Sequence, residues 1–339
     1  MELLHHASYS FTSEQLLAQS YSQSIEPYWQ QYAEPGSFKG VNQLNIHYLK
    51  LPAATPTNKL IVLSPGRTEG YLKYAELAYD LAQQHYDVLI IDHRGQGLSD
   101  RETARQQPGD VANFQYYVDD LAELINRHLA AHNYQDKYLL AHSMGGAIVA
   151  RYLEQQPADF NAVALSAPMF GINLGAVPKP IAAGLSRTIH QLEQRFKRGP
   201  YYAPGQKDYR PSSFAANHLT HSQARYQQML AVYQRHPQIQ LGGPTNRWLT
   251  ESFNAMQQCI NNAHKITRPL LLLQAEQDQI VTAEGQRGFF QALNSSSAAA
   301  SQFSIITGAK HEIMFERDAI RNLALSKVLD FFAQHTNEG

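Results

Sequence analysis

Ser143, Asp278 and His311 are residues whose types can together carry nucleophilic catalysis, and they follow three predicted strands in that order along the chain. A serine hydroxyl attacks a carbonyl group only when a base removes its proton, and the base must be oriented by a third group. In open α/β sheets, ligands bind at the carboxyl ends of the strands, so residues in the loops there can meet in one site. The sequence therefore predicts a Ser-His-Asp triad at this edge of a sheet.

The stretch LLAHSMGGAI, residues 139–148, contains the candidate nucleophile. It is typical of a buried strand that turns sharply at Ser143 and continues as a helix to Glu154, which is the setting of a nucleophile elbow. The usual pattern is G-x-S-x-G, and Ala141 stands at the first glycine position, where alanine is the smallest available substitute. A serine that only caps the following helix is the alternative interpretation.

Asp278 and Glu276 are the acids that could orient the base. The segment PLLLLQAE, residues 269–276, is a predicted buried strand; Asp278 lies just past it, whereas Glu276 lies at its edge. An isolated aspartate in such a place is most often a turn residue or a helix cap. In such triads the acid follows a strand and precedes the histidine. Asp278 is favoured because it lies in the loop past the strand, whereas Glu276 should still lie within the strand or at its edge.

His311 is the predicted base. It lies in the loop that follows the strand QFSIIT, residues 302–307, and precedes the final helix. Taken alone, it could be a loop residue that bonds to the backbone. With Glu312 it begins an H-E-x-x-H zinc motif, but position 315 is phenylalanine, so the motif fails and no metal ligand is predicted.

Backbone N–H groups are needed to stabilise the negative charge that develops on the carbonyl oxygen. The N–H of Met144, directly after the serine, is one predicted donor, and the N–H of Arg67, in the loop SPGRTEGY, is the other. The Arg67 side chain could bind a phosphate or carboxylate of the substrate. Pairing with Glu69 or another acid, which would fix the loop, is the favoured interpretation.

Strands and helices alternate over most of the chain, which predicts an α/β fold with a mostly parallel, doubly wound sheet. A short helix (13–20) and a Glu34–Pro35–Gly36 turn precede an antiparallel hairpin within residues 37–51. The later predicted strands cover residues 59–64, 86–92, 137–142, 161–167, 269–276 and 302–307. The predicted helices cover residues 71–84, 114–125, 144–154, 283–293 and 317–335, and a Ser/Ala-rich loop covers 294–301.

The alternation stops between Pro168 and about Thr267, in a segment rich in Gln, His, Tyr and Arg. Helices are predicted there at residues 181–196, 219–235 and 246–264. Apolar residues fall on one face of the first of them: Ile181, Leu185, Ile189, Leu192 and Phe196. We interpret the segment as a helical cap, which divides the chain into core residues 1–167, cap residues 168–267 and core residues 268–339.

The composition limits the classes of protein that the chain can represent. At 339 residues, with 43% hydrophobic and 17% charged residues, the chain is long enough for a large core with an insertion. The net charge is 28 − 29 = −1, which gives no basis for nucleic-acid binding. The single cysteine, Cys259, excludes an intrachain disulfide. The N-terminal residues lack the features of a signal peptide, and no run approaches the ~18 apolar residues of a membrane span.

With these motifs in place, the chain resembles the α/β-hydrolase superfamily over nearly its whole length, and within it the monoacylglycerol lipase-like serine hydrolases. The AHSMGG and SPGR variants resemble the branch of bacterial lysophospholipases of the L-two type, since the broader group usually shows GHSMGG and an HG-type oxyanion loop. The segments that carry the resemblance are residues 63–82, 87–100, 139–148, 165–172 and 242–248, together with LLLQAEQDQIV and GAKHEIMFE.

The resemblance implies an α/β-hydrolase fold with a cap, with Ser143 as nucleophile, Asp278 as orienting acid and His311 as base. It implies a lipid substrate, either a lysophospholipid or a monoacylglycerol, and no metal, organic cofactor or nucleic-acid partner. It also implies a cytoplasmic protein that contacts the inner face of a Gram-negative inner membrane peripherally. We further expect His142 and Phe170 to contact the substrate.

The cap carries positive charge that could meet such a membrane. Between Arg187 and Arg210 there are six basic and two acidic residues, a local charge of +4, beside a predicted amphipathic helix. Each basic residue near an anionic lipid surface adds about 1 kcal/mol to binding. A solvated face on a cap helix is an equal alternative.

Three other functions are compatible with the same residues. A monoacylglycerol lipase or general carboxylesterase would use the same machinery. An acyltransferase would pass the acyl group to another lipid alcohol instead of water. A catalytically silent lipid-binding protein on this fold is the alternative from a different class.

Overall fold

The structure is a computed structural model that describes residues 9–156, 160–175, 177–295 and 300–337. Two sequence predictions lie partly outside these residues. They are the absence of a signal peptide, which concerns residues 1–8, and the Ser/Ala-rich loop at 294–301.

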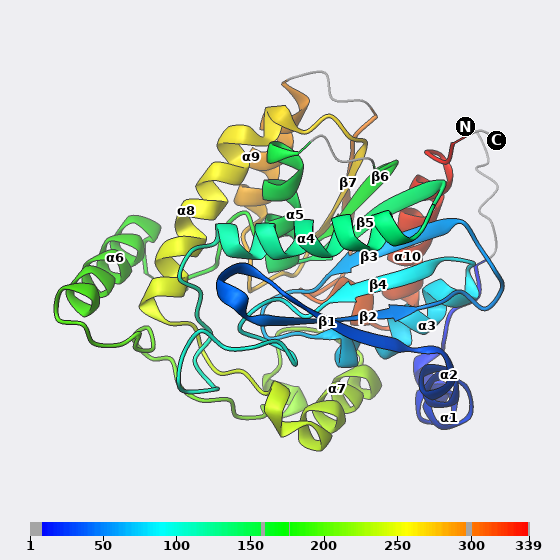
Figure 1. The fold of residues 1–339 in the computed structure, drawn as a ribbon, viewed down its shortest axis with the longest axis horizontal. Coiled ribbons are helices and arrows are strands. Elements are labelled where there is room, and N and C mark those ends of the chain that lie inside the picture. Colours follow the sequence, from blue (N-terminus) through cyan, green and yellow to red (C-terminus); the bar gives the residue numbers. More distant parts are fainter. Residues whose placement is uncertain (1–8, 157–159, 176, 296–299, 338–339) are drawn as a thin grey trace.

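Within the described residues, an eight-stranded sheet forms the centre of the molecule (Figure 1). Its order is β1-β2-β4-β3-β5-β6-β7-β8; β2 pairs antiparallel with both of its neighbours, and the remaining pairs are parallel. The predicted sheet and its N-terminal hairpin are confirmed. The strands are β1 (Glu34–Lys39), β2 (Asn45–Leu51), β3 (Lys59–Ser64), β4 (Asp87–Ile91), β5 (Asp136–His142), β6 (Ala162–Ser166), β7 (Leu270–Ala275) and β8 (Gln302–Ile306).

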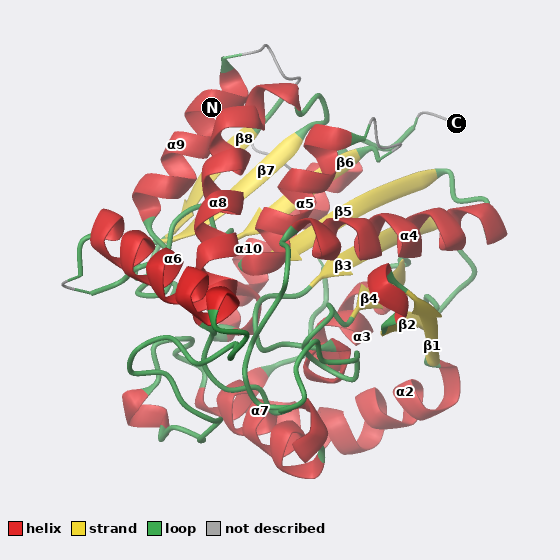
Figure 2. Cartoon of the chain, turned by 60° about the vertical axis from the view of Figure 1, so that its left-hand side comes forward, coloured by secondary structure: helices red, strands yellow, loops and turns green. Residues whose placement is uncertain are grey.

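Helices cover both faces of this sheet (Figures 1 and 2). One apolar core joins the sheet to α4 (Gln115–Ala131), α5 (Met144–Gln155), α8 (Asn246–Asn262) and α9 (Ala283–Asn294). The core on the other face involves α3 (Ala75–Gln83) and α10 (Asp318–Ala333). Because the central strands are covered on both sides, their sequences are continuous apolar runs and not alternating ones.

The predicted turn at Glu34–Pro35–Gly36 is wrong, because these residues form the start of β1. Glu34 and Pro35 pair with Lys50 and Leu49 of β2. β1 lies at the edge of the sheet, where a proline is tolerated because one row of N–H groups has no strand partner.

The N-terminal helix is longer than the predicted residues 13–20. After a 3₁₀ turn at Glu14–Leu16, α1 (Leu17–Ser20) continues through a π-helical turn into α2 (Glu26–Tyr32). The Tyr28 ring packs edge-on against Tyr79 of α3, at a centroid distance of 5.4 Å. This tertiary contact stabilises helix in a polar stretch whose local pattern predicts a loop.

The predicted insertion contains α6 (Lys179–Arg195), α7 (Gln223–Arg235) and α8, as expected from its helical periodicity. α8 differs from the other two, because its buried side chains, Trp248, Phe253, Met256 and Cys259, belong to the core shared with α4, α5 and α9. The division of the chain into core and cap at residue 267 stays a prediction. α6 lies on the outer side of α8, away from the sheet (Figure 1).

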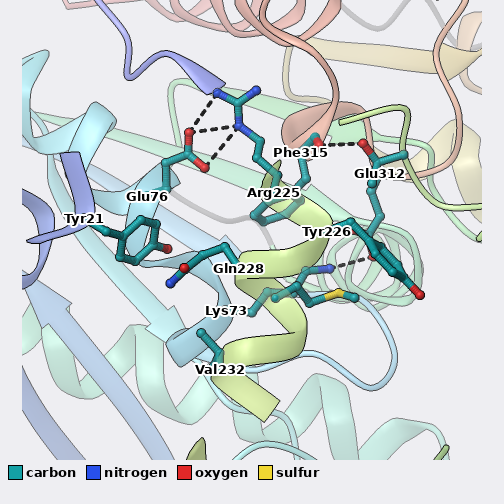
Figure 3. Close-up of a pocket in the computed structure, with 11 residues that line it drawn as sticks. Tyr21, Lys73, Glu76, Arg225, Tyr226, Gln228, Val232, Glu312 and Phe315 are labelled. Carbon is teal, nitrogen blue, oxygen red and sulfur yellow. Dashed lines mark hydrogen bonds and ion pairs between the residues drawn. The ribbon is translucent and has the colours of Figure 1, made fainter. Parts of the chain in front are cut away.

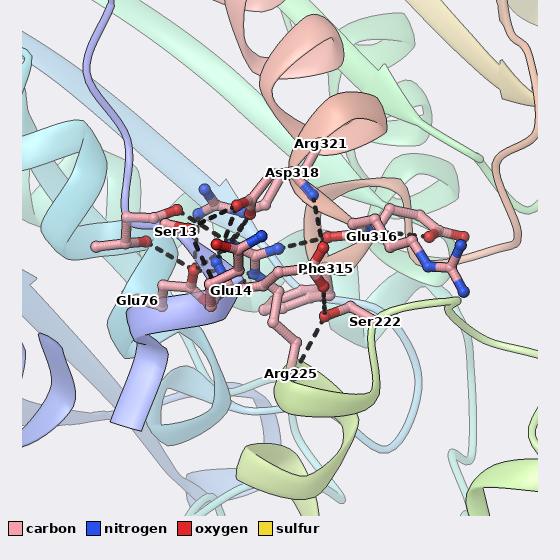
Figure 4. Close-up of polar contacts among 12 residues, drawn as sticks. Ser13, Glu14, Glu76, Ser222, Arg225, Phe315, Glu316, Asp318 and Arg321 are labelled. Carbon is pink, nitrogen blue, oxygen red and sulfur yellow. Dashed lines mark hydrogen bonds and ion pairs between the residues drawn. The ribbon is translucent and has the colours of Figure 1, made fainter. Parts of the chain in front are cut away.

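α7 is joined to the core by buried ion pairs (Figures 3 and 4). Arg225 of α7 binds Glu76 of α3 at 2.9 Å and Asp318 of α10 at 2.8 Å. Beside them, Arg321 binds Asp80 at 2.6 Å. Figure 4 shows these groups converging from α3, α7, α10 and the N-terminal segment. The apolar side of α7 packs around Tyr226, Met229, Val232 and Tyr233.

Candidate active site

The candidate site lies where the strand order changes direction. β3 pairs with β4 on one side and with β5 on the other, so the chain leaves β3 toward one side and returns on the opposite side. Ser64, the last residue of β3, is aligned with Ala141 of β5. The loop that contains Arg67 is therefore brought beside the turn that contains Ser143. Such a switch point forms a crevice at the carboxyl ends of the strands.

Ser143 stands at a strained turn between β5 and α5. Its φ of 51° and ψ of −116° are unfavourable for a residue with a side chain. The turn is held by hydrogen bonds from the Ser143 N–H to the Ser166 carbonyl and from the Met169 N–H to the Ser143 carbonyl. A Cβ atom on Gly145 would lie only 2.1 Å from the Ser64 carbonyl oxygen, so glycine is required there for α5 to approach β3. The predicted strand–turn–helix setting of the serine is present.

The three predicted triad residues are joined by hydrogen bonds. Ser143 Oγ lies 3.0 Å from His311 Nε2, and His311 Nδ1 lies 2.8 Å from Asp278 Oδ2. The other Asp278 oxygen accepts the N–H groups of Ile280 and Val281. Burial alone would raise the pKa of Asp278, but these donors and His311 hold it below its usual value. Asp278 is therefore an ionised acceptor that places the Nδ1 proton of His311, which leaves Nε2 free to accept the serine proton.

The alternative acid, Glu276, does not reach His311. It is exposed, and its Oε2 accepts the Gly308 N–H at 2.8 Å. The geometry thus brings Asp278, and not Glu276, to the histidine.

Two backbone donors beside Ser143 are without a partner in the described part of the chain. They are the N–H groups of Arg67 and Met144, for which no hydrogen bond is formed. The loop containing Arg67 approaches the serine closely, since a Cβ on Gly66 would lie 3.2 Å from Ser143 Cβ. Unsatisfied N–H groups in this position can donate hydrogen bonds to a developing oxyanion, which is the arrangement that acyl transfer requires.

A buried polar network supports these two loops from behind. Lys73 Nζ lies 2.6 Å from a carboxylate oxygen of Glu69 and 2.6 Å from one of Glu312. Glu69 also accepts the Gly66 N–H and interacts with Nδ1 of His142 at 3.1 Å. Because Glu312 follows His311 in the chain, Lys73 connects the loop of the backbone donors with the loop of the histidine.

The charges of this network compensate one another. Burial alone would lower the pKa of Lys73 and raise that of Glu69, but their pairing shifts both in the opposite direction. The His142 ring lies between Glu69, which contacts its Nδ1, and the backbone carbonyl of His311, which lies 3.3 Å from Nε2 of His142. Although burial opposes it, Glu69 raises the pKa of His142. The two carboxylates thus share the Lys73 ammonium, and Glu69 also contacts the His142 ring.

The Arg67 side chain does not pair with Glu69, as the favoured interpretation predicted. Glu69 binds Lys73 and His142, and Arg67 pairs with no carboxylate in the described ranges. Its Nη2 donates to the Gly242 carbonyl at 2.6 Å, and its guanidinium lies over the Trp248 ring, 5.1 Å from the centroid. Burial lowers the pKa of Arg67 to about 10, so the group is still a cation at neutral pH.

A cavity of about 250 Å³ opens at Ser143 and His311. Arg67 and His142 lie in its wall together with Glu69 and Glu312. Much of the remaining wall is apolar and comes from four separate segments: Met169, Ile172, Leu219, Trp248, Leu249 and Val281. A wall of this kind suits an apolar chain with a polar group near the serine.

Phe170, predicted to contact substrate, does not line this cavity. It is fully buried and stacks on Phe289 with ring centroids 3.9 Å apart. Its neighbours Met169 and Ile172 reach the cavity instead. His142, the other predicted contact, does lie in the wall.

The sequence analysis missed two residues of the site: Trp248, in the predicted cap, and Lys73, in the buried polar network. Trp248 lies in GGPTNRW, a segment noted only for its resemblance, and Lys73 lies on an apparently ordinary helix start. A lysine between two apolar residues, four positions after Glu69, is the sequence signal that could have revealed the network. Among the described residues, no group of three or more His, Cys, Asp or Glu side chains is arranged to hold a metal ion.

Comparison with known proteins assigns the chain to a family. The profile of a hydrolase family described as serine aminopeptidase, S33, matches residues 55–318. Lysophospholipase L2 of Escherichia coli is 39% identical over 315 residues, which cover 92% of this chain and 91% of that protein. The chain therefore belongs to the hydrolase family whose profile it matches. The probable lysophospholipase L2 of Haemophilus influenzae is 34% identical over 318 residues, covering 90% of this chain and 97% of the relative.

Solved structures confirm the α/β-hydrolase fold. The crystal structure of a Paleococcus ferrophilus monoacylglycerol lipase superposes with a TM-score of 0.66 at 19% identity, covering 85% of this chain and 98% of the other. The family and fold implied by the resemblance of the motifs are therefore both established for this chain.

Proposed function

We propose that the protein hydrolyses the carboxylic ester of lysophospholipids and releases a fatty acid. The observation that carries this proposal is the hydrogen-bonded chain Asp278–His311–Ser143, which opens into a cavity with a largely apolar wall. The substrate class is supported by two bacterial relatives, named lysophospholipase L2 and probable lysophospholipase L2, each matched over nine-tenths or more of its length.

In the proposed reaction, Ser143 Oγ attacks the ester carbonyl carbon while His311 Nε2 accepts the hydroxyl proton. The N–H groups of Arg67 and Met144 donate to the oxyanion. His311 then gives its proton to the leaving glycerol oxygen, and the acyl group is left on Ser143. Water, deprotonated by His311, attacks the acyl-enzyme and releases the fatty acid. Asp278 stays ionised and stabilises the imidazolium that forms twice in this cycle.

Monoacylglycerol hydrolysis is the second candidate, because the same cavity wall fits the single acyl chain of either lipid. Relatives at lower identity, such as the monoacylglycerol lipase of Mycolicibacterium smegmatis, 23% identical over 299 residues, also favour it. Acyl transfer to another lipid alcohol uses the same acyl-enzyme and differs only in the acceptor.

We also propose that the cap, residues 168–267 without α8, docks on an anionic membrane through α6. Ala182, Ala183 and Ser186 of α6 face the protein, whereas bulky apolar side chains are exposed: Ile181, Leu185, Leu192 and Phe196. Arg187, Arg195, Lys197 and Arg198 are exposed beside them, and no carboxylate of the described residues pairs with them. Amphipathic helices of this composition lie in the interface of anionic bilayers. No helix in the described part of the chain is long and apolar enough to cross a bilayer.

A lipid panel tests the proposed function. Purified protein and a Ser143→Ala variant are incubated with lysophosphatidylethanolamine, monoacylglycerol and diacylphospholipid that carry the same acyl chain, and released fatty acid is measured. We expect release from the lysophospholipid that depends on Ser143. Preferred release from monoacylglycerol would move the assignment to the second candidate. A product in which the acyl group is found on another lipid would identify a transferase, and no turnover of any lipid would contradict the proposal.

A further inference from the structure

Arg67 is the one charge in the described cavity wall that has no charged partner. Glu69 and Glu312 share Lys73, Glu69 also meets His142, and Asp278 meets His311. Arg67 itself contacts the Gly242 carbonyl and the Trp248 ring, and no ion pair joins it to a carboxylate of the described residues. The wall therefore carries a positive charge at the position of Arg67.

The hydrogen-bonding capacity of this guanidinium is also incompletely used. Nη2 donates to the Gly242 carbonyl, whereas Nε is enclosed and donates to nothing among the described residues. An enclosed N–H without an acceptor costs free energy, and a partly buried cation without an anion costs more. The Trp248 ring holds the guanidinium in place by a cation–π contact and offers it no hydrogen-bond acceptor. An anionic ligand in the cavity would supply the counter-charge that the Arg67 guanidinium lacks.

The position of Arg67 relative to Ser143 fits one such ligand. Its backbone N–H belongs to the proposed oxyanion hole, and its side chain extends from there to the Trp248 wall of the same cavity. In a lysophospholipid, the phosphate is joined to the scissile ester by the short glycerol backbone. A monoacylglycerol has only a hydroxyl at that place. Arginine binds phosphate oxygens with paired, charge-assisted hydrogen bonds.

We propose that the Arg67 side chain binds the phosphate diester of the lipid head group and makes the protein selective for lysophospholipids over neutral monoacylglycerols. This inference rests on the proposed ester hydrolysis and adds to it the recognition of an anionic head group. The competing explanation is that Arg67 only fixes the Gly242 loop through its hydrogen bond to the carbonyl.

The test compares kcat/KM for lysophosphatidylcholine and monoacylglycerol of equal chain length in wild type, Arg67→Met and Arg67→Lys. Methionine retains an apolar side chain over Trp248 but has no charge. We expect Arg67→Met to lower kcat/KM for the lysophospholipid about 10- to 100-fold more than for the monoacylglycerol, mainly through KM. Arg67→Lys should recover part of the selectivity. Arg127→Met, which removes an exposed arginine of α4, should leave both substrates unaffected. Equal losses on the two substrates would show a loop clamp and overturn the inference.

A binding measurement separates this inference from the proposed hydrolysis. Calorimetric titration with glycerophosphocholine, using glycerol as the neutral comparison, should detect binding to wild type that is lost in Arg67→Met. If wild type hydrolyses neither lipid but this difference in binding remains, the proposed function fails and the phosphate site stands. If glycerophosphocholine binds wild type and Arg67→Met equally, or binds neither, the phosphate site is refuted even when the lipids are hydrolysed.

Discussion

α6 and α7 are both amphipathic helices of the predicted cap, yet they use their apolar sides in opposite ways. α7 packs Tyr226, Val232 and Tyr233 against the protein, and its Arg225 side chain is only 1% exposed between Glu76 and Asp318. α6 turns its small residues inward and leaves Phe196, directly after its last turn, 68% exposed. α7 contacts the N-terminal helical segment, beside which it lies in Figure 2, whereas Figure 1 shows α6 at the periphery.

The difference shows that an amphipathic pattern identifies a helix but not the partner of its apolar face. The apolar face of α7 has a partner within the chain, and buried charges fix its position. The apolar face of α6 has none among the described residues, because the helix lies against α8 with a different face, on which Ala182 and Ala183 pack on the core and Ser186 is buried. An exposed apolar face beside unpaired cations is typical of a surface that meets lipid. The four predictions below test this contrast, beginning with the largest effect.

Arg225→Met should destabilise the fold by about 3–5 kcal/mol, because it removes the cation that pairs with Asp318 and leaves buried Glu76 only the more distant Arg321, at 3.7 Å. The free energy of unfolding in urea measures the effect. Arg187→Met, which removes an exposed arginine from α6, is the matched control and should change stability by less than about 0.5 kcal/mol. Similar losses for the two variants would contradict the contrast between the helices.

Truncation of an apolar side chain should also destabilise the fold more in α7 than in α6, although the losses are smaller than for Arg225→Met. Met229→Ala on α7 removes a buried side chain and should cost roughly 2 kcal/mol. Leu192→Ala on α6 removes an exposed one and should cost less than about 0.5 kcal/mol. Thermal or urea unfolding compares them, and a larger cost at Leu192 would mean that α6 is packed against the protein in solution.

Lipid binding should depend on α6. Replacing Leu185 and Leu192 together by glutamine removes two exposed apolar side chains and should weaken binding to vesicles containing phosphatidylglycerol at least tenfold, on the order of 1.4 kcal/mol or more. Vesicle sedimentation measures this. Leu323→Gln, at an exposed leucine of α10, is the control and should bind like wild type. Equal binding by all three proteins would refute the membrane role of α6.

The attachment of α7 should weaken in acid. Although burial alone would raise it, the Glu14 N–H, Arg225 and Ser13 hold the pKa of Asp318 below its usual value. A carboxyl with a lowered pKa stabilises the fold above its unfolded pKa of about 3.9, and this contribution is lost as the pH falls through the folded value. The difference in unfolding midpoint between wild type and Asp318→Asn should therefore narrow below about pH 4. If the difference in unfolding midpoint between the two proteins were constant from pH 7 to pH 3, the stabilisation by Asp318 would come from packing and not from its charge.

Ser143, Asp278 and His311 could be found from the sequence because each follows a strand with a strong continuous apolar pattern, and strand ends meet at one edge of a parallel sheet. The motif around Ser143 reflects a local requirement, since the turn and its close approach to β3 restrict the residues on either side. Local constraints of this kind leave a signature in the sequence.

The partners of the other polar groups could not be found in this way. Glu69 was expected to pair with Arg67, two positions away, but its partners are Lys73, one helical turn later, and His142. Glu312, the second partner of Lys73, is 239 positions away in the chain. The start of β1 was mistaken for a turn because proline and glycine are frequent in turns, and only the position of the strand at the sheet edge explains Pro35. These features depend on tertiary placement, which the local pattern does not contain.

The central claim, that Ser143 is an activated nucleophile, is tested most directly by reaction with a fluorophosphonate followed by mass mapping of the folded protein. The account predicts one adduct, on Ser143, that is absent in Ser143→Ala and forms slowly in His311→Ala, because the histidine must take the serine proton. No adduct on folded wild type, or an adduct on another residue, would contradict it.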